Sequence, residues 1–254
     1  MQILTSQLPS GGYGYDFPSV SVSPLNFLQI TKYLENMPQT SDPLEKYLYD
    51  FKMLVDEDEK VLDLYLMDID FLIFYKKLCT VSEDLSYSIK VKCPSCGEMI
   101  GKKITLTEDI HFKQVDPKIM EGATIELGGS KFETRVPTGR EFNKVFEVYL
   151  KYRKVTDLKI IKTISLIKDF DIRANEIERC VLGATHSDIT LLLALQELYF
   201  DQVEPITVYC PKCDKGKKKE ERRGVAVSVD SLIVDFFRDL CDNSPIDGSK
   251  ILFK

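Results

Sequence analysis

Two short cysteine motifs, placed far apart along the chain, constrain its fold more than any other feature of the sequence. The first is Cys-Pro-Ser-Cys-Gly at residues 93–97, and the second is Cys-Pro-Lys-Cys-Asp at residues 210–214. Two residues between paired cysteines allow a tight turn that directs both sulfurs toward one point, and two such turns supply the four thiolates of a tetrahedral zinc site. The pattern predicts one structural zinc ion, with four ligands: Cys93, Cys96, Cys210 and Cys213.

The residues around each pair predict a β-hairpin. Apolar and polar residues alternate before the first pair and after the second, and further β-type segments follow the first and precede the second. The residue after each pair is expected to adopt a positive φ, which glycine does freely and aspartate acceptably. Gly97 and Asp214 occupy these two positions. Each pair is therefore expected at the tip of a hairpin, as in a zinc ribbon.

The separation of the pairs is unusual. Compact four-cysteine sites have about 15–20 residues between the two pairs, whereas 113 residues separate Cys96 from Cys210. We therefore predict one zinc ribbon, built from residues 85–109 together with 203–229, that is split by an inserted β-hairpin and helical segment at residues 110–202.

Other uses of these cysteines stay open. A redox pair normally lies at a helix N-terminus, and two pairs can also be buried without metal. A catalytic zinc keeps one position open for water, which four thiolates do not leave. Neither His111 nor His186 has a partner at ligand spacing, although either could replace a thiolate. The other cysteines fall beside apolar helical faces and are expected in the core: Cys79, Cys180 and Cys241.

Composition places the chain among ordinary globular proteins. It has 254 residues, of which 44% are hydrophobic and 29% charged. The formal net charge of −6 gives no overall attraction to nucleic acid or to anionic membranes. No apolar run reaches the about 20 residues of a transmembrane helix, and no signal peptide is visible. An odd number of cysteines argues against a disulfide framework. We therefore expect an intracellular protein without a membrane partner.

The rest of the sequence predicts an α+β fold, with an N-terminal arm and helices (residues 1–84) and a C-terminal helix and tail (residues 230–254). Gly128-Gly129 predicts a tight hairpin turn. Start signals and apolar spacing predict the helices. They are expected after Ser23-Pro24, after Asp42-Pro43, over 67–81 with Asp68 as cap, over 139–152 with Thr138 as cap, over 157–168, over 174–181, over 188–200 with Ser187 or Asp188 as cap, and from Asp230.

Three further segments have plain interpretations. The glycines at positions 11, 12 and 14 lack the remainder of a phosphate-binding motif and predict a turn or an extended arm. The acidic residues 56–59 lack the spacing of a calcium loop and predict a solvated connection. A basic loop after Cys213 favours a solvated hairpin tip, because it has no aromatic residue on which a base could stack. The alternative is a zinc-ribbon nucleic-acid-binding protein that uses Lys217, Lys218, Lys219, Arg222 and Arg223.

The order of several motifs resembles the baseplate hub or hub-assembly proteins of T4-type contractile-tailed phages. These begin with a short Leu-Pro-Ser-Gly arm, present here at residues 8–12, followed by helices and a strand that enters a Cys-Pro-x-Cys-Gly turn, here residues 93–97. A hairpin that ends in Arg-x-Pro-Thr follows, here residues 135–138, and then a helical region. The resemblance spans most of the chain but does not extend over residues 230–254.

The resemblance implies a virion protein of the tail baseplate, assembled in the host cytoplasm. It implies a structural or assembly component that docks to other tail proteins and is not an enzyme. No small-molecule substrate is expected and nucleic acid is an unlikely partner, while the glycine-rich arm would be a docking strand for a neighbour. An enzyme whose site only the fold assembles stays open, although no Ser/His/Asp or Cys/His set is visible.

Overall fold

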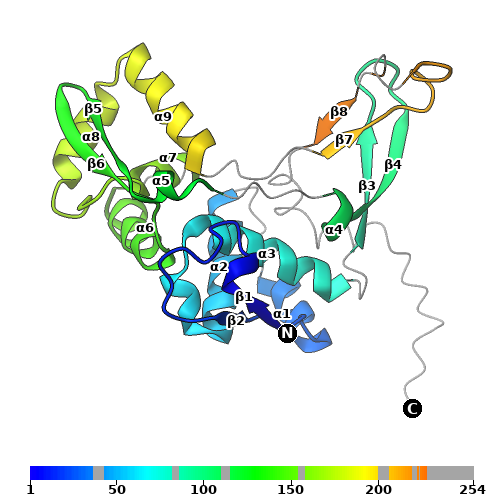
Figure 1. Ribbon diagram of the computed structural model, residues 1–254, viewed down its shortest axis with the longest axis horizontal. Coiled ribbons are helices and arrows are strands. Elements are labelled where there is room, and N and C mark those ends of the chain that lie inside the picture. Colours follow the sequence, from blue (N-terminus) through cyan, green and yellow to red (C-terminus); the bar gives the residue numbers. More distant parts are fainter. Residues whose placement is uncertain are drawn as a thin grey trace.

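The computed structural model describes residues 1–36, 43–81, 86–109, 115–153, 158–199, 206–218, 222 and 224–227. Within them, the chain combines α-helices with small antiparallel two-stranded sheets, as the sequence predicts (Figure 1). The paired strands are β1 (Gln2–Leu4) with β2 (Ser19–Ser21), β3 (Ser86–Lys92) with β4 (Met99–Thr105), β5 (Ala123–Leu127) with β6 (Ser130–Thr134), and β7 (Ile206–Val208) with β8 (Val225–Val227).

The helices occupy most of the predicted positions. They are α1 (Phe27–Asn36), α2 (Pro43–Glu57), α3 (Leu66–Val81), α4 (Leu106–Asp109), α5 (Pro117–Met120), α6 (Gly139–Arg153), α7 (Leu158–Ser165), α8 (Ala174–Leu182) and α9 (His186–Tyr199), with short 3-10 helices η1 (Thr5–Gln7) and η2 (Glu59–Asp63). No helix among the described residues is long and apolar enough to span a bilayer. The helix predicted from Asp230 lies outside the described residues.

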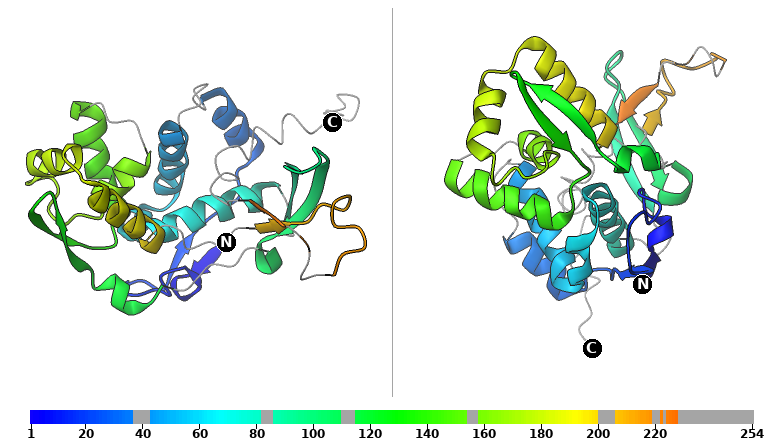
Figure 2. Two further views of the ribbon diagram at one scale, coloured as in Figure 1. Left: turned by 90° about the horizontal axis from the view of Figure 1, so that it is seen from above. Right: turned by 60° about the vertical axis from the view of Figure 1, so that its left-hand side comes forward.

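Helix α3 is the centre of the molecule. Seen from above, it runs between the lobe of α6 to α9 and the cysteine-bearing hairpins (Figure 2). Its sequence is apolar almost all round, which is typical of a buried helix, and eight of its apolar side chains are buried. These are Leu66, Met67, Ile69, Phe71, Leu72, Ile73, Phe74 and Leu78. The prediction of a buried helix over residues 67–81 is confirmed.

The predicted cap of α3 is wrong. The Asp68 carboxylate does not cap its own helix but accepts hydrogen bonds from the backbone N–H of Ser10, at 2.8 Å, and from the Ser10 and Tyr15 hydroxyls. A buried carboxylate needs such donors, because burial without them is costly. The glycine-rich segment therefore forms a turn whose donors bind the Asp68 carboxylate of the same chain.

The N-terminal arm is part of this chain's own core. Strand β1 pairs with β2, and Leu8, Val20 and Val22 are all buried. Of the two forms predicted, turn and extended arm, the structure has the turn, with positive φ at each of Gly11, Gly12 and Gly14. These buried side chains and paired strands are used within the chain, which corrects the expectation of an extended docking strand.

The N-termini of two helices differ from the expected ones. Helix α1 begins at Phe27 rather than after Ser23-Pro24, because Asn26 and Gln29 cap each other's backbone N–H groups. Thr185, rather than Ser187 or Asp188, caps α9, with Asp188 as its reciprocal partner.

The acidic residues 56–59 are more than a solvated connection. Glu57 pairs with the buried Lys76 ammonium. Asp58 caps η2 and accepts the Ser21 N–H.

Two other helix start signals and the glycine turn are confirmed. Helix α2 begins at Pro43, and Thr138 and Glu141 form the reciprocal cap of α6. Strands β5 and β6 pair across Gly128-Gly129, where both glycines have positive φ, as a two-residue hairpin turn requires.

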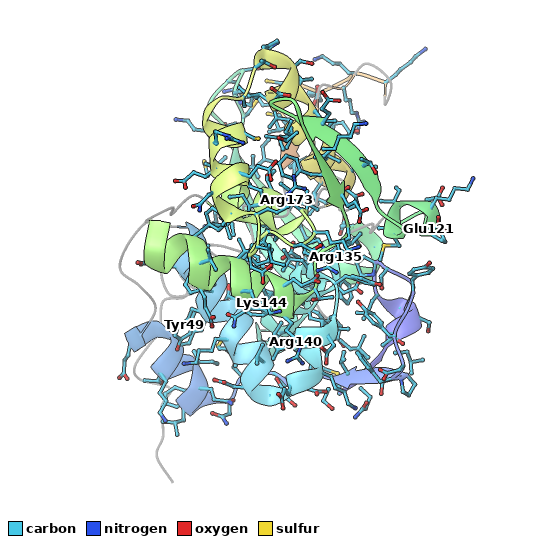
Figure 3. The ribbon with its side chains drawn as sticks, turned by 90° about the vertical axis from the view of Figure 1, so that its left-hand side faces the viewer. Tyr49, Glu121, Arg135, Arg140, Lys144 and Arg173 are labelled. Carbon is cyan, nitrogen blue, oxygen red and sulfur yellow. The ribbon has the colours of Figure 1, made fainter. Side chains whose placement is uncertain are left out.

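Two distant segments meet where α3 begins. The Tyr15 hydroxyl accepts the Tyr65 N–H, so the N-terminal arm holds this point from one direction. From the other, Pro137 O accepts the Leu66 N–H and Leu64 O accepts the Gly139 N–H. Arg135 and Arg140 lie next to this junction (Figure 3). Arg135 pairs with Glu141, and Arg140 pairs with Asp63. The residue 8–12 and 135–138 motifs thus belong to one structural unit.

Candidate metal centre

The first cysteine pair lies in the turn between β3 and β4. These strands pair over seven positions and end at the Lys92–Met99 pair, so the turn holds residues 93–98. Cys93 N donates to Glu98 O, and Gly97 N donates to Cys93 O at 2.9 Å. Gly97 has a φ of 74°, as its position after the pair predicts. A side chain there would strain the turn.

The second pair lies in the segment that follows β7. Asp214 N donates to Cys210 O at 2.9 Å, the counterpart of the Gly97 bond in the first turn. Asp214 does not have the predicted positive φ, which falls instead on Gly216, at 79°. This turn continues through residue 216 before the chain reverses, so the left-handed position moves two residues onward.

The fold brings the two pairs together. The Sγ atoms of Cys93 and Cys213 are 3.9 Å apart, and those of Cys96 and Cys210 are 3.6 Å apart. All four sulfurs lie within 4.8 Å of one another, and they are the group among the described residues that could hold a metal ion. The prediction that the distant pairs share one site is therefore confirmed at the level of geometry.

The sulfur spacing fits a tetrahedral metal. Zinc–thiolate bonds of about 2.3 Å place the corners of a tetrahedron about 3.8 Å apart. The measured separations of 3.6 Å and 3.9 Å lie on either side of that value. They are far longer than a disulfide bond of about 2.05 Å, and the four residues are free thiols. Each short separation also joins one turn to the other, so a metal here would cross-link the two hairpins.

The electrostatics of the cluster also favour a cation. Backbone N–H groups of Cys96 and Ser95 lower the pKa of the Cys93 thiol to about 7. Two effects raise the pKa of the Cys213 thiol to about 12: the larger is a hydrogen bond with Cys96 and the second is burial. Without a cation, the Cys213 thiol therefore keeps its proton near neutral pH. A divalent metal would displace this proton, because thiolates are its ligands.

The site stands at one end of the molecule. The two cysteine-bearing hairpins lie side by side and apart from the lobe of α6 to α9 (Figures 1 and 2). Cys93 and Cys210 are buried, whereas Cys96 is exposed. Four cysteine ligands leave a metal with no open position for water or substrate, so the arrangement suits a structural role.

The remaining candidate ligands lie elsewhere. His186 is exposed at the start of α9 and is not in the cluster. Cys180 is buried next to Gly128, as expected of a core cysteine, and Cys79 is half-buried in α3. His111 and Cys241 lie outside the described residues.

The basic loop after Cys213 is partly engaged with itself. The Lys217 ammonium lies 3.3 Å from the Asp214 carboxylate, and Arg222 donates to the Lys217 carbonyl. Lys218 is exposed. Lys219 and Arg223 lie outside the described residues. Two of the basic residues predicted as a nucleic-acid site therefore hold the loop in shape.

Comparisons of the chain with protein-family models, with curated proteins and with solved structures found no match.

Proposed function

We propose that the four cysteines bind one structural zinc ion and that the hairpins around them form a zinc ribbon split by residues 110–202. The observation that carries this proposal is the set of four sulfurs within 4.8 Å of one another. Zinc favours four thiolates in a tetrahedral site. The zinc would join two hairpins that are more than 100 residues apart in the sequence and would fix their relative position.

Metal analysis of the purified full-length chain tests this part. The expected result is one zinc per chain, which the Cys210→Ser variant loses and the Cys180→Ser variant keeps. Both cysteines are buried, but only Cys210 belongs to the cluster. A wild-type chain that takes up no zinc at neutral pH, under reducing conditions, would contradict the proposal.

The role that this scaffold best suits is a structural or assembly component of the baseplate hub in a contractile phage tail. In this role the chain docks to other tail proteins and catalyses no reaction. The support is the order of motifs in the sequence, together with their placement in the fold. The arm at residues 8–12 and the segment at 135–138 are both bonded to residues 64–68, so the motifs serve one shared structure.

Affinity purification tests the hub role. The tagged chain is recovered from the cells that produce it, treated with nuclease, and its partners are identified by mass spectrometry. Recovery of tail or baseplate proteins is the expected result. If only polymerase or ribosomal proteins were recovered, and only without nuclease, the hub role would be wrong.

A further inference from the structure

The outer face of the β3–β4 hairpin is lined by lysines. Antiparallel partners share a face of the sheet, so Lys90 and Lys92 of β3 lie on the same side as Lys103 of β4. All three are exposed. The opposite face carries the buried side chains of Ile89, Ile100 and Ile104, as well as Lys102, which pairs with Asp109 at 2.7 Å.

The cysteine-bearing hairpins differ in charge from the remainder of the chain. Residues 86–105 and 206–227 together contain 11 Lys and Arg against four Asp and Glu. The rest contains 23 Lys and Arg against 36 Asp and Glu. A mildly acidic protein thus carries a compact basic unit, and a local field of this kind can attract a polyanion even when the net charge is negative.

Gly101 makes the lysine face open to close approach. It pairs with Lys90 in the middle of the face, and a Cβ built on it meets no atom within 4 Å. Its φ is not positive, so neither packing nor backbone conformation requires glycine here. Glycine inside a strand costs about 0.5–1 kcal/mol and often marks a place where a ligand comes close to the backbone.

The composition of the face indicates the kind of ligand. Lysine is depleted in protein–protein interfaces but serves phosphate contacts as a point charge. Single-stranded nucleic acid is bound with aromatic side chains on which bases stack. The exposed residues of this face include none, because they are Ser88, Lys90, Lys92, Met99, Gly101 and Lys103.

We propose that this outer face, defined by Lys90, Lys92, Lys103 and Gly101, binds the phosphate backbone of double-stranded nucleic acid without sequence preference. The binding is separate from docking to tail proteins and does not depend on the hub role. It also uses a surface different from the loop after Cys213, which the sequence alone singles out.

Fluorescence anisotropy of the zinc-loaded full-length chain with labelled DNA duplexes of two unrelated sequences tests this proposal. Both duplexes are expected to bind equally, with an affinity that falls as salt rises. Log affinity falls with log salt, and the triple variant Lys90→Gln/Lys92→Gln/Lys103→Gln should make this slope less steep by about 3, one for each lost phosphate contact. A matched triple variant of exposed lysines elsewhere, Lys118→Gln/Lys131→Gln/Lys144→Gln, should leave the slope unchanged.

A second variant separates binding from folding. Gly101→Val places a strand-favouring side chain where space is open, so the unfolding temperature should hold or rise while duplex affinity falls. The proposal is overturned if the wild type binds no duplex at low salt, or if the face and control variants behave alike. It is also overturned if only a Lys212→Gln/Lys215→Gln/Lys218→Gln loop variant loses binding. If polyglutamate displaced the labelled duplex as effectively as unlabelled duplex does, the ligand would instead be an acidic protein surface.

Discussion

The two cysteine-bearing hairpins differ in core from the helical body, which is the remainder of the described chain. Among the side chains that the structure describes, α3 alone contributes eight buried apolar ones to the body, whereas the four hairpin strands together contribute five. Those five are Ile89, Ile100, Ile104, Ile206 and Val208. Each hairpin has two strands, and an isolated two-stranded hairpin is marginally stable in water. The hairpin residues join the same hydrophobic cluster as α3, but they are few. We therefore expect packing to stabilise the body and a metal cross-link to stabilise the hairpins, as in small domains with little core.

Polar groups are also used differently in the two regions. The body buries charged groups in pairs, such as Asp50 with Lys77, and ties its arm to Asp68. The hairpins instead gather four thiols at one end and expose lysines on one face. If the two proposals above hold, a metal and a polyanion act on the hairpins, whereas the body depends on packing and on its buried charged groups.

Removal of a cysteine ligand should have the largest effect. In Cys93→Ser or Cys210→Ser, the site loses a thiolate, and with it much of a binding free energy that is about 10–16 kcal/mol for structural zinc. We expect the variants to lose metal and to unfold the hairpins, as measured by zinc content and by proteolysis between residues 86 and 105. Cys180→Ser is the control. Full zinc retention by Cys210→Ser would contradict this account.

Breaking the buried ion pair should have the next largest effect, confined to the body. Lys77→Met leaves Asp50 buried without its main cation and should cost about 3–5 kcal/mol in chemical denaturation. The double variant Asp50→Leu/Lys77→Met should cost less than Lys77→Met alone, because the buried carboxylate is removed together with its main cation, although the Tyr33 hydroxyl loses its acceptor. A double variant less stable than the single one would show that the pair itself is the source of stability.

The arm should respond to pH through Asp68. Burial raises the pKa of this carboxyl to about 6, although its bonds to Ser10 and Tyr15 oppose the shift. Because the folded state holds the proton more tightly than the unfolded state, Asp68 lowers stability as pH rises from about 4 to about 6, by about 1–3 kcal/mol. Chemical denaturation across this range should show the decline in wild type and a flatter profile in Asp68→Asn. Parallel profiles would contradict the assignment.

Loss of a helix cap should have the smallest effect. Thr138→Ala removes an acceptor for the Glu141 N–H at the start of α6 and should cost about 1 kcal/mol. Thr138→Ser keeps the acceptor and serves as the control. Equal unfolding midpoints for the two variants would show that the hydroxyl does not stabilise the helix.

The parts of the fold that could be predicted from sequence rest on local chemistry. Paired cysteines two residues apart need few neighbours to define their turn, and the same holds for Gly128-Gly129, for Pro43 at the start of α2 and for Thr138 before α6. The meeting of the two cysteine pairs could also be predicted, because each turn alone offers too few ligands for a closed site.

The parts that could not be predicted depend on contacts between distant residues. Asp68 has the position of a cap, but donors from Ser10 and Tyr15, more than 50 residues away, take its carboxylate. Ser23-Pro24 has the pattern of a helix start, yet Asn26 provides the better reciprocal cap. The lysine face was visible only as polar alternation in β3, and strand pairing was needed to add Lys103 and Gly101 to it.

Hydrogen exchange with and without a zinc chelator tests the central claim most directly. We predict that chelation of the zinc-loaded chain removes protection from amides in residues 86–105 and 206–227, while amides of α3 keep theirs. The helical body would then be stabilised by packing and the hairpins by the metal. If chelation left the hairpins protected, or if α3 lost protection together with them, the division between the two regions would be wrong.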